Sequence, residues 1–155
     1  SPRITRGDFE KLEDQEGPFD VIVLRGVLEH LVDPLRSLEQ IGKLVVGGGV
    51  FFITATPNVE SPCAELFRDR WNQFDPIQHV SHFSAAQLSK VLQPSGLELE
   101  AQYYPYLETP YARPQDDLAR VLEGVRAAGE GSRSVLPRSP AFWGNMMTLV
   151  FRKMK

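Results

Sequence analysis

Hydrophobic residues in the first third of the chain form two short continuous runs with a helical stripe between them. The runs, Asp20–Leu24 and Val50–Ala55, are rich in β-branched and aromatic residues, as in strands that are buried on both faces of a parallel sheet. Asp33-Pro34 predicts a helix start, because Asp accepts hydrogen bonds from free amides and Pro suits the first helical position. Strand, helix and strand in this order predict a right-handed βαβ unit. The helical stripe consists of Leu35, Leu38, Ile41 and Val45.

Residues that commonly begin or end helices predict the other elements. Gly47, Gly48 and Gly49 indicate a turn that ends the first helix. Ser84 to Gln87 predicts a capping box, with Phe83 and Leu88 at the two hydrophobic staple positions. The remaining elements are a short helix at 63–70, an irregular loop at 71–82, a strand at 97–106, a helix at 115–127 and a final strand at 147–152.

Composition and charge exclude several classes of protein. The 155 residues, 42% of them hydrophobic and 24% charged, suit one domain with a real core. The net charge of −3 does not indicate binding to nucleic acid, which favours a strongly basic surface. The sequence contains no basic run and no long apolar run that would indicate contact with a membrane. A single cysteine, Cys63, excludes an internal disulfide framework and favours a reducing, cytoplasmic location.

Glu29 and His30 are the sharpest candidates for chemistry. They follow the first predicted strand at its carboxyl end, where open α/β sheets bind their ligands. A histidine with an ordinary pKa, near ~6.5, can act as general base toward a hydroxyl or an amine. The alternative is that Glu29 orients the loop and that His30 packs as a half-buried ring.

His79 and His82 have the spacing H-x-x-H, which raises the possibility of a metal site and of a metal hydrolase. A zinc site needs further ligands within reach, and the third histidine and the cysteine lie in other segments. We therefore expect substrate-pocket or structural histidines here, and no metal.

A series of short motifs runs through almost the whole chain. It consists of Phe19-Asp20-Val21-Ile22, Leu28-Glu29-His30-Leu31, Asp33-Pro34, Gly48-Gly49, Thr56-Pro57-Asn58, His79 to Ser84, Pro94 to Leu97 and the ending Asn145 to Lys153. In this order the motifs resemble the second half of a class I S-adenosylmethionine-dependent methyltransferase. The resemblance implies an α/β fold, a partial doubly wound Rossmann-like sheet with strands four, five, seven and six of that fold and an antiparallel last strand. It also implies methyl transfer from S-adenosylmethionine to a small-molecule oxygen, nitrogen or carbon.

The resemblance assigns roles to individual residues. It implies cofactor contacts from Asp8, Phe9 and Arg25, an acceptor pocket lined by Asn58, His79 and Trp71, and catalysis by His30 and Glu29. Plainer alternatives stand beside these roles. The segment around Asp8 is then an exposed loop, Asn58 caps a turn, and the aromatic residues tuck the loop at 71–82 onto the core.

The glycine-rich cofactor loop of the family has no counterpart in this sequence. No G-x-G-x-G segment occurs, and Gly47 to Gly49 precede a strand instead of following one. We therefore expect residues 1–155 to form the C-terminal portion of a methyltransferase domain, with 1–17 poorly anchored. Alone, this portion is expected to be inactive and to bind S-adenosylmethionine weakly or not at all. The alternative is a non-catalytic interaction module or a degenerate relative.

The strand order of the family has a further consequence for the run Asp20–Leu24. Without the strands that precede it in the family, this run becomes an edge strand that is apolar on both faces. Such an edge is a template for pairing with another chain. We expect self-association through this strand, a small-molecule substrate, and neither nucleic acid nor membrane as a partner.

Overall fold

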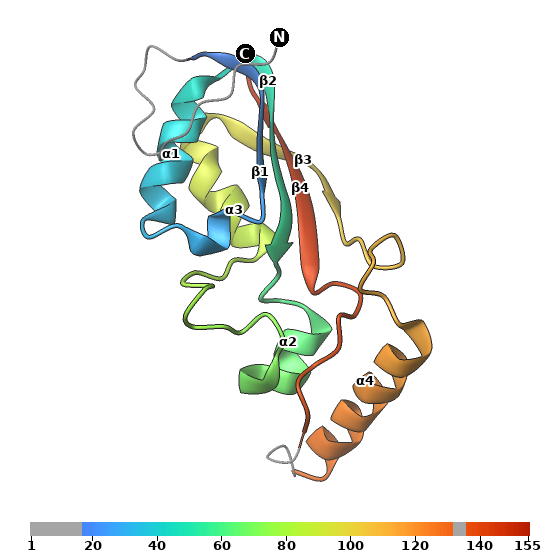
Figure 1. The fold of residues 1–155 in the computed structure, drawn as a ribbon. Helices are drawn as coiled ribbons and strands as arrows, with labels where there is room; N and C mark the ends of the chain where they lie inside the picture. Colours follow the sequence, from blue (N-terminus) through green and yellow to red (C-terminus); the bar gives the residue numbers. More distant parts are fainter. Residues whose placement is uncertain (1–16, 132–135) are drawn as a thin grey trace.

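The computed structural model describes residues 17–131 and 136–155, which contain one four-stranded mixed sheet (Figure 1). Its strands are β1 (Phe19–Arg25), β2 (Val45–Pro57), β3 (Leu97–Tyr103) and β4 (Met146–Lys153). The spatial order is β1-β2-β4-β3, in which β1 and β2 are parallel and β4 is antiparallel to both of its neighbours. The predicted α/β class and the insertion of the last strand into the sheet are confirmed.

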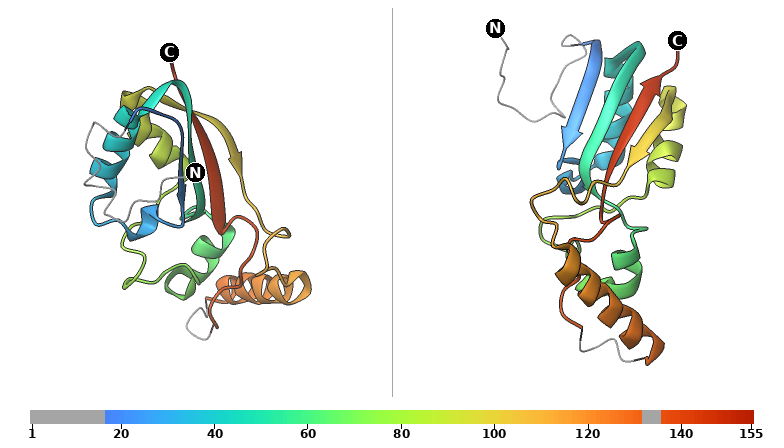
Figure 2. Two further views of the ribbon diagram at one scale, coloured as in Figure 1. Left: turned by 45° about the horizontal axis from the view of Figure 1, so that its top comes forward. Right: turned by 90° about the vertical axis from the view of Figure 1, so that its right-hand side faces the viewer.

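The helices divide into two groups. Helices α1 (Pro34–Leu44) and α3 (Ala85–Leu92) cover one face of the sheet (Figure 2). Helices α2 (Pro62–Phe67) and α4 (Pro114–Gly129) lie beyond the carboxyl ends of β1 and β2, at the lower end in Figure 1. Three short 3-10 turns, Leu28–His30, Arg68–Arg70 and Gln93–Ser95, complete the described elements. None of the helices in the described ranges is long and apolar enough to cross a membrane.

Both helix starts predicted from local signals are confirmed. The Asp33 carboxylate accepts a hydrogen bond from the Arg36 amide at 3.1 Å, and Pro34 occupies the first turn of α1. Ser84 and Gln87 form the complete capping box of α3, because each side chain accepts a hydrogen bond from the backbone amide of the other residue, at 3.2 and 2.9 Å. These caps satisfy amides that the first helical turn leaves without a partner.

The main core lies between the sheet and the pair α1 and α3. Alternate residues of the strands face the helices, and the rings of Phe51 on β2 and Phe151 on β4 pack with centroids 6.3 Å apart. Each large apolar side chain that is buried here contributes roughly 1.5–3 kcal/mol. The fully buried members from the helices are Leu38, Ile41, Leu88 and Leu92.

Two local predictions were wrong. Leu35 is 55% exposed, because it lies in the first turn of α1 and outside the stripe that faces the sheet. The three glycines do not form a turn. They lie inside β2, where the register of β1 jumps from the pair Phe19–Val45 to the pair Val21–Val50. A Cβ on Gly49 would come within 2.9 Å of the Asp20 carbonyl oxygen, so glycine is required at this bulge.

The other predicted bounds differ by a few residues. The strand predicted to reach residue 106 ends at Tyr103, while the last helix and the last strand are each slightly longer than predicted. The segment predicted as one helix over 63–70 is divided, with α2 ending at Phe67 and a 3-10 turn following. Helix ends are set by tertiary contacts as well as by local signals, and shifts of this size are common.

Strand β1 has a neighbour on one side only within the described residues. Its residues alternate in exposure. Leu24 is 7% exposed under the helices, whereas Val21 and Val23 are 54% and 55% exposed on the opposite face of the sheet. Within the described residues β1 is therefore an edge strand with apolar residues on both faces, one face covered by α1 and α3 and the other exposed.

Candidate functional site

The site lies at the edge of the sheet where the parallel strands β1 and β2 end. Two residues there have left-handed backbone conformations, Gly26 with φ 57° and Ala55 with φ 55°. The Gly26 amide donates to the Thr54 carbonyl at 3.0 Å, so the two strand ends are held together as they turn out of the sheet. A positive φ at an alanine costs on the order of 1–3 kcal/mol, and such strain concentrates at functional sites.

Glu29 is the buried centre of this edge. It lies in the 3-10 turn after β1 and is only 3% exposed. The Thr56 hydroxyl at the end of β2 donates to its carboxylate at 3.4 Å. The backbone carbonyl of Glu29 accepts hydrogen bonds from the amides of Val80 and Ser81, at 2.9 and 3.3 Å. One residue therefore joins β1, β2 and the 71–82 loop.

His30 and His79 meet beside Glu29. The ring centroids of the two histidines are 5.0 Å apart, and His30 Nε2 lies 3.9 Å from Glu29 Oε1. His30 Nδ1 lies 2.7 Å from the Gln78 carbonyl oxygen, and His79 Nδ1 lies 2.8 Å from that of Gln73. A carbonyl oxygen only accepts, so both Nδ1 atoms carry a proton, and in the neutral rings both Nε2 atoms keep a lone pair. The structure thus brings together three residues that the sequence analysis singled out.

His82 is positioned differently from His79. Its Nε2 donates to the Gln73 carbonyl at 3.1 Å, and its ring packs against Trp71 and Phe74, with centroids 5.5 and 6.0 Å away. The H-x-x-H pair therefore shares a backbone acceptor, and His82 serves the packing of the loop.

Two residues predicted to line the acceptor pocket are buried and hydrogen-bonded within the protein. Trp71 is 3% exposed, and its indole N–H donates to Asn145 Oδ1 at 3.2 Å. Asn58 is 6% exposed; its amide donates to the Gly144 carbonyl and accepts from the Glu60 amide, both at 3.1 Å. These contacts match the structural alternatives, in which Trp71 packs the 71–82 loop onto the core and Asn58 caps a turn.

Only one of the three residues predicted to contact the cofactor is among the described residues. Arg25 is the exposed last residue of β1 at the same edge. Asp8 and Phe9 lie outside the described residues. Contact between these three residues and the cofactor stays a prediction.

Asn145 is a functional candidate that sequence reasoning missed. It is buried just before β4, and its side chain accepts from Trp71 and donates to Asn72 Oδ1 and the Pro140 carbonyl, at 3.2 and 2.8 Å. It forms part of the wall of a hollow of about 400 Å³ between the 71–82 loop and the segments flanking α4. No local signal marks this role, because its partners come from segments far apart in the sequence.

The hollow combines aromatic and amide groups. Tyr106, Tyr111 and Phe142 contribute rings, and Asn72 and Gln73 contribute polar atoms. Gln73 is also the residue whose carbonyl binds His79, so the hollow adjoins the histidine pair through one residue. Burial and the hydrogen bond donated to Asp117 at 2.7 Å raise the pKa of the Tyr106 hydroxyl to about 12.

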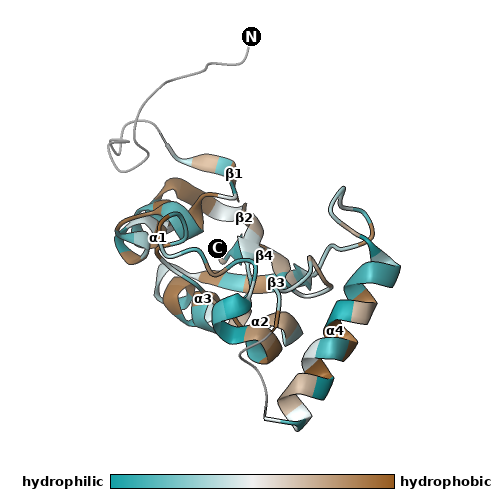
Figure 3. Cartoon of the chain, turned by 60° about the horizontal axis from the view of Figure 1, so that its bottom comes forward, coloured by the Kyte–Doolittle hydropathy of each residue, from teal (hydrophilic) through white to brown (hydrophobic). Residues whose placement is uncertain are grey.

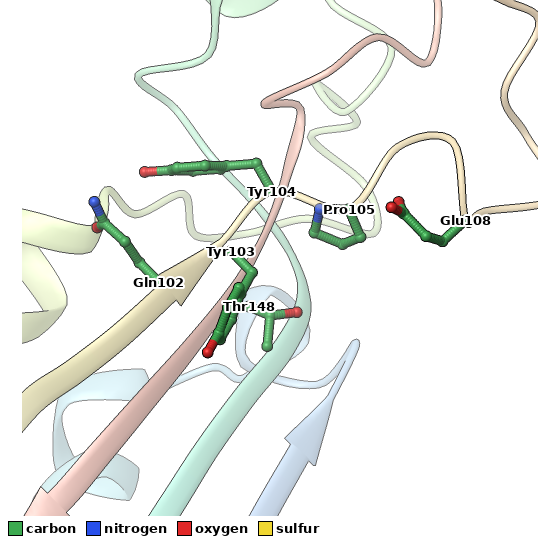
Figure 4. Close-up of a pocket in the computed structure, with 6 residues that line it drawn as sticks. All are labelled: Gln102, Tyr103, Tyr104, Pro105, Glu108 and Thr148. Atoms are coloured by element: carbon green, nitrogen blue, oxygen red, sulfur yellow. The ribbon is translucent and has the colours of Figure 1, made fainter.

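A second hollow, of about 540 Å³, opens beside Tyr103 and Thr148 (Figure 4). Figure 4 shows the Tyr103 ring beside Thr148 and the Tyr104 ring turned away from both. None of the described residues that line it is a histidine or a cysteine, so it is a weaker candidate for chemistry. Cys63 is also unsuited as a nucleophile, because burial raises the pKa of its thiol to about 12.

Comparisons with known proteins agree with this geometry. The sequence profile of a family described as "Methyltransferase domain" matches residues 3–102. A Mycolicibacterium smegmatis protein named as a probable S-adenosylmethionine-dependent methyltransferase is 30% identical over 99 residues, which are 63% of this chain and 35% of that protein. The chain therefore spans about a third of the length of this curated relative.

Solved structures share the fold at low sequence identity. The methyltransferase candidate BH2331 of Bacillus halodurans matches 97% of this chain and 71% of its own, with a TM-score of 0.60 and 17% identity. Magnesium protoporphyrin IX methyltransferase from Synechocystis, solved with bound SAH, matches 95% of this chain and 49% of its own, with a TM-score of 0.55 and 11% identity.

The mixed sheet, with its candidate site at the carboxyl edge, defines a Rossmann-like methyltransferase fold. Because the family profile covers most of the chain, the chain belongs to the methyltransferase-domain family, of the class I S-adenosylmethionine-dependent type.

Proposed function

We propose that the protein transfers a methyl group from S-adenosylmethionine to a small-molecule acceptor, and that this chain supplies the acceptor side of the site. The observation that carries the proposal is the meeting of Glu29, His30 and His79 at the carboxyl edge of β1 and β2, next to a hollow of about 400 Å³. A hollow of this size suits a small molecule, since ligand pockets commonly measure about 300–1,000 Å³.

His30 is the candidate general base. In the reaction, the acceptor's oxygen or nitrogen attacks the methyl carbon as the carbon–sulfur bond breaks, and neutral S-adenosylhomocysteine leaves. The acceptor's proton passes to the lone pair on His30 Nε2, which the Nδ1–H bond to Gln78 orients. The Glu29 carboxylate, 3.9 Å away, then stabilises the imidazolium that forms.

The proposal divides the cofactor contacts between segments. Asp8, Phe9 and Arg25 would contact S-adenosylmethionine, whereas the glycine loop that holds it in the family has no counterpart among these 155 residues. The chain alone is therefore proposed to bind the cofactor weakly and to be inactive by itself. We also propose that residues 1–155 form one domain, which acts in the cytoplasm.

The first prediction concerns cofactor binding. Calorimetric titration of S-adenosylmethionine into this chain should show a dissociation constant on the order of millimolar or weaker. A chain extended at its N-terminus by the strand and glycine loop of a methyltransferase of this family should bind far more tightly. Micromolar binding to the 155-residue chain would contradict the proposed division of contacts.

The second prediction concerns His30 in such a cofactor-binding protein. His30→Gln should lower turnover by roughly 10²–10⁴-fold, the usual contribution of a general base. Cofactor affinity and thermal stability should not change, because the side chain is 44% exposed. Lys90→Gln, on the exposed side of α3, is the matched control and should leave turnover intact. Lost stability with unchanged turnover would show instead that His30 has a packing role.

A second candidate function is that of an interaction module. The specific observation is the sheet face opposite α1 and α3, where Val21 and Val23 are each more than half exposed on the strand that lies at the edge of the described sheet. Helix α4 also carries a half-exposed apolar stripe. Its residues, Leu118, Leu122 and Val125, recur at helical spacing and are each 50% exposed. Figure 3 shows brown, hydrophobic positions along this helix between the teal ones. We propose that two copies of this chain pair through β1.

The third prediction tests pairing through β1. Light scattering over a concentration series should show association of the 155-residue chain. Val23→Lys should abolish it, because a lysine on an edge strand opposes further pairing. Val32→Lys is the control, since Val32 is 93% exposed but lies outside β1. A chain that stays monomeric throughout, or one that responds equally to both substitutions, would rule out pairing through β1.

A further inference from the structure

We infer that Glu29, His30 and His79 form a binding site for one divalent first-row transition-metal ion. The sequence analysis predicted no metal here, because the segment around His79 and His82 offers no further histidine or cysteine as a ligand. The structure supplies a different set: one candidate ligand atom from each of the three residues, all within 4.8 Å of one another. The ligands come from two segments that lie far apart in the sequence.

The hydrogen-bond geometry of His30 and His79 is that of metal-binding histidines. Metal-binding imidazoles generally donate their other ring N–H to a carbonyl or a carboxylate, which fixes the tautomer and the ring orientation. Here the Nδ1–H groups of His30 and His79 donate to the carbonyls of Gln78 and Gln73, at 2.7 and 2.8 Å. The Nε2 lone pair of each ring is therefore left for an ion.

The carboxylate is held by burial and by one long hydrogen bond. Glu29 is 3% exposed, and the Thr56 hydroxyl donates to its Oε2 at 3.4 Å. Its Oε1 is the oxygen that lies 3.9 Å from His30 Nε2. Ligand atoms around tetrahedral zinc, at bond lengths of about 2.0–2.2 Å, stand about 3.3 Å apart. Around an ion the three ligand atoms would therefore have to draw together from separations of up to 4.8 Å, and the His30 side chain, which is 44% exposed, has room to move.

The donor set selects the class of ion. Two imidazoles and one carboxylate suit zinc and its neighbours in the first row, whereas Mg²⁺ and Ca²⁺ prefer ligand sets made of oxygen. Three protein ligands leave a coordination position open, and the 44% exposure of His30 gives solvent or substrate access to it.

Occupation by an ion would change how an acceptor is activated. His30 Nε2 cannot bind an ion and accept a proton at the same time. With the ion in place, an acceptor hydroxyl would bind at the open position, where the ion lowers its pKa. This consequence rests on the proposed methyl transfer, but binding of the ion itself does not.

The experiment is calorimetric titration of Zn²⁺ into the tag-free 155-residue chain, without S-adenosylmethionine. One ion should bind per chain, and Mg²⁺ at the same concentrations should give no saturable heat. His79→Ala and His30→Ala should each weaken Zn²⁺ binding by more than the roughly 10–100-fold that loss of an outer partner costs. His82→Ala is the matched control and should change the affinity less than either, because His82 lies outside the ligand set.

A second readout separates lost ligands from lost folding. Zn²⁺ should raise the melting temperature of the wild-type chain and of His82→Ala, but not that of His30→Ala. The His30 side chain is 44% exposed, so its removal should leave the chain folded. Absence of saturable Zn²⁺ binding would overturn the inference. Equal loss of affinity in His82→Ala, or binding of Mg²⁺ as tight as that of Zn²⁺, would also overturn it. None of these results depends on whether the protein transfers methyl groups.

Discussion

The arrangement of the candidate site depends on the attachment of the 71–82 loop to the backbone of Glu29. Two amides, those of Val80 and Ser81, donate to its carbonyl at the edge where β1 ends. Each such hydrogen bond contributes only about 0.5–1.5 kcal/mol net, but leaving a buried carbonyl unpaired costs about 1–3 kcal/mol. The loop therefore docks in one register, and that register places His79 beside His30.

A second polar contact, between Trp71 and Asn145, joins the smaller hydrophobic cluster to the segment before β4. The main core lies under α1 and α3, and a smaller one is formed by Cys63, Phe67, Trp71 and Leu136. Asn145, just before β4, accepts a hydrogen bond from the Trp71 indole N–H. The helices beyond the sheet edge are thus tied to the strands by polar contacts, and the hollow beside them keeps its amide and aromatic wall.

Local chemistry explains which parts of this fold and site could be predicted. The N-cap at Asp33 and the capping box at Ser84 were predictable, because their partners lie three residues away. The position of Glu29 and His30 followed from the strand before them. The bulge at Gly47 to Gly49 was missed because it depends on the register of β1 against β2. The roles of Thr56 and Asn145 were missed for a related reason, since partners far apart in sequence define them.

The most direct test of the account is the tautomeric state of the three histidines, measured by long-range proton–nitrogen NMR on the neutral, ion-free rings. The docked loop predicts a proton on Nδ1 of His30 and His79, and a proton on Nε2 of His82. That pattern leaves two Nε2 lone pairs beside Glu29, free to accept a proton or bind an ion. Protons on Nε2 of both His30 and His79 would contradict it, because neither ring could then donate through Nδ1 to the Gln78 and Gln73 carbonyls.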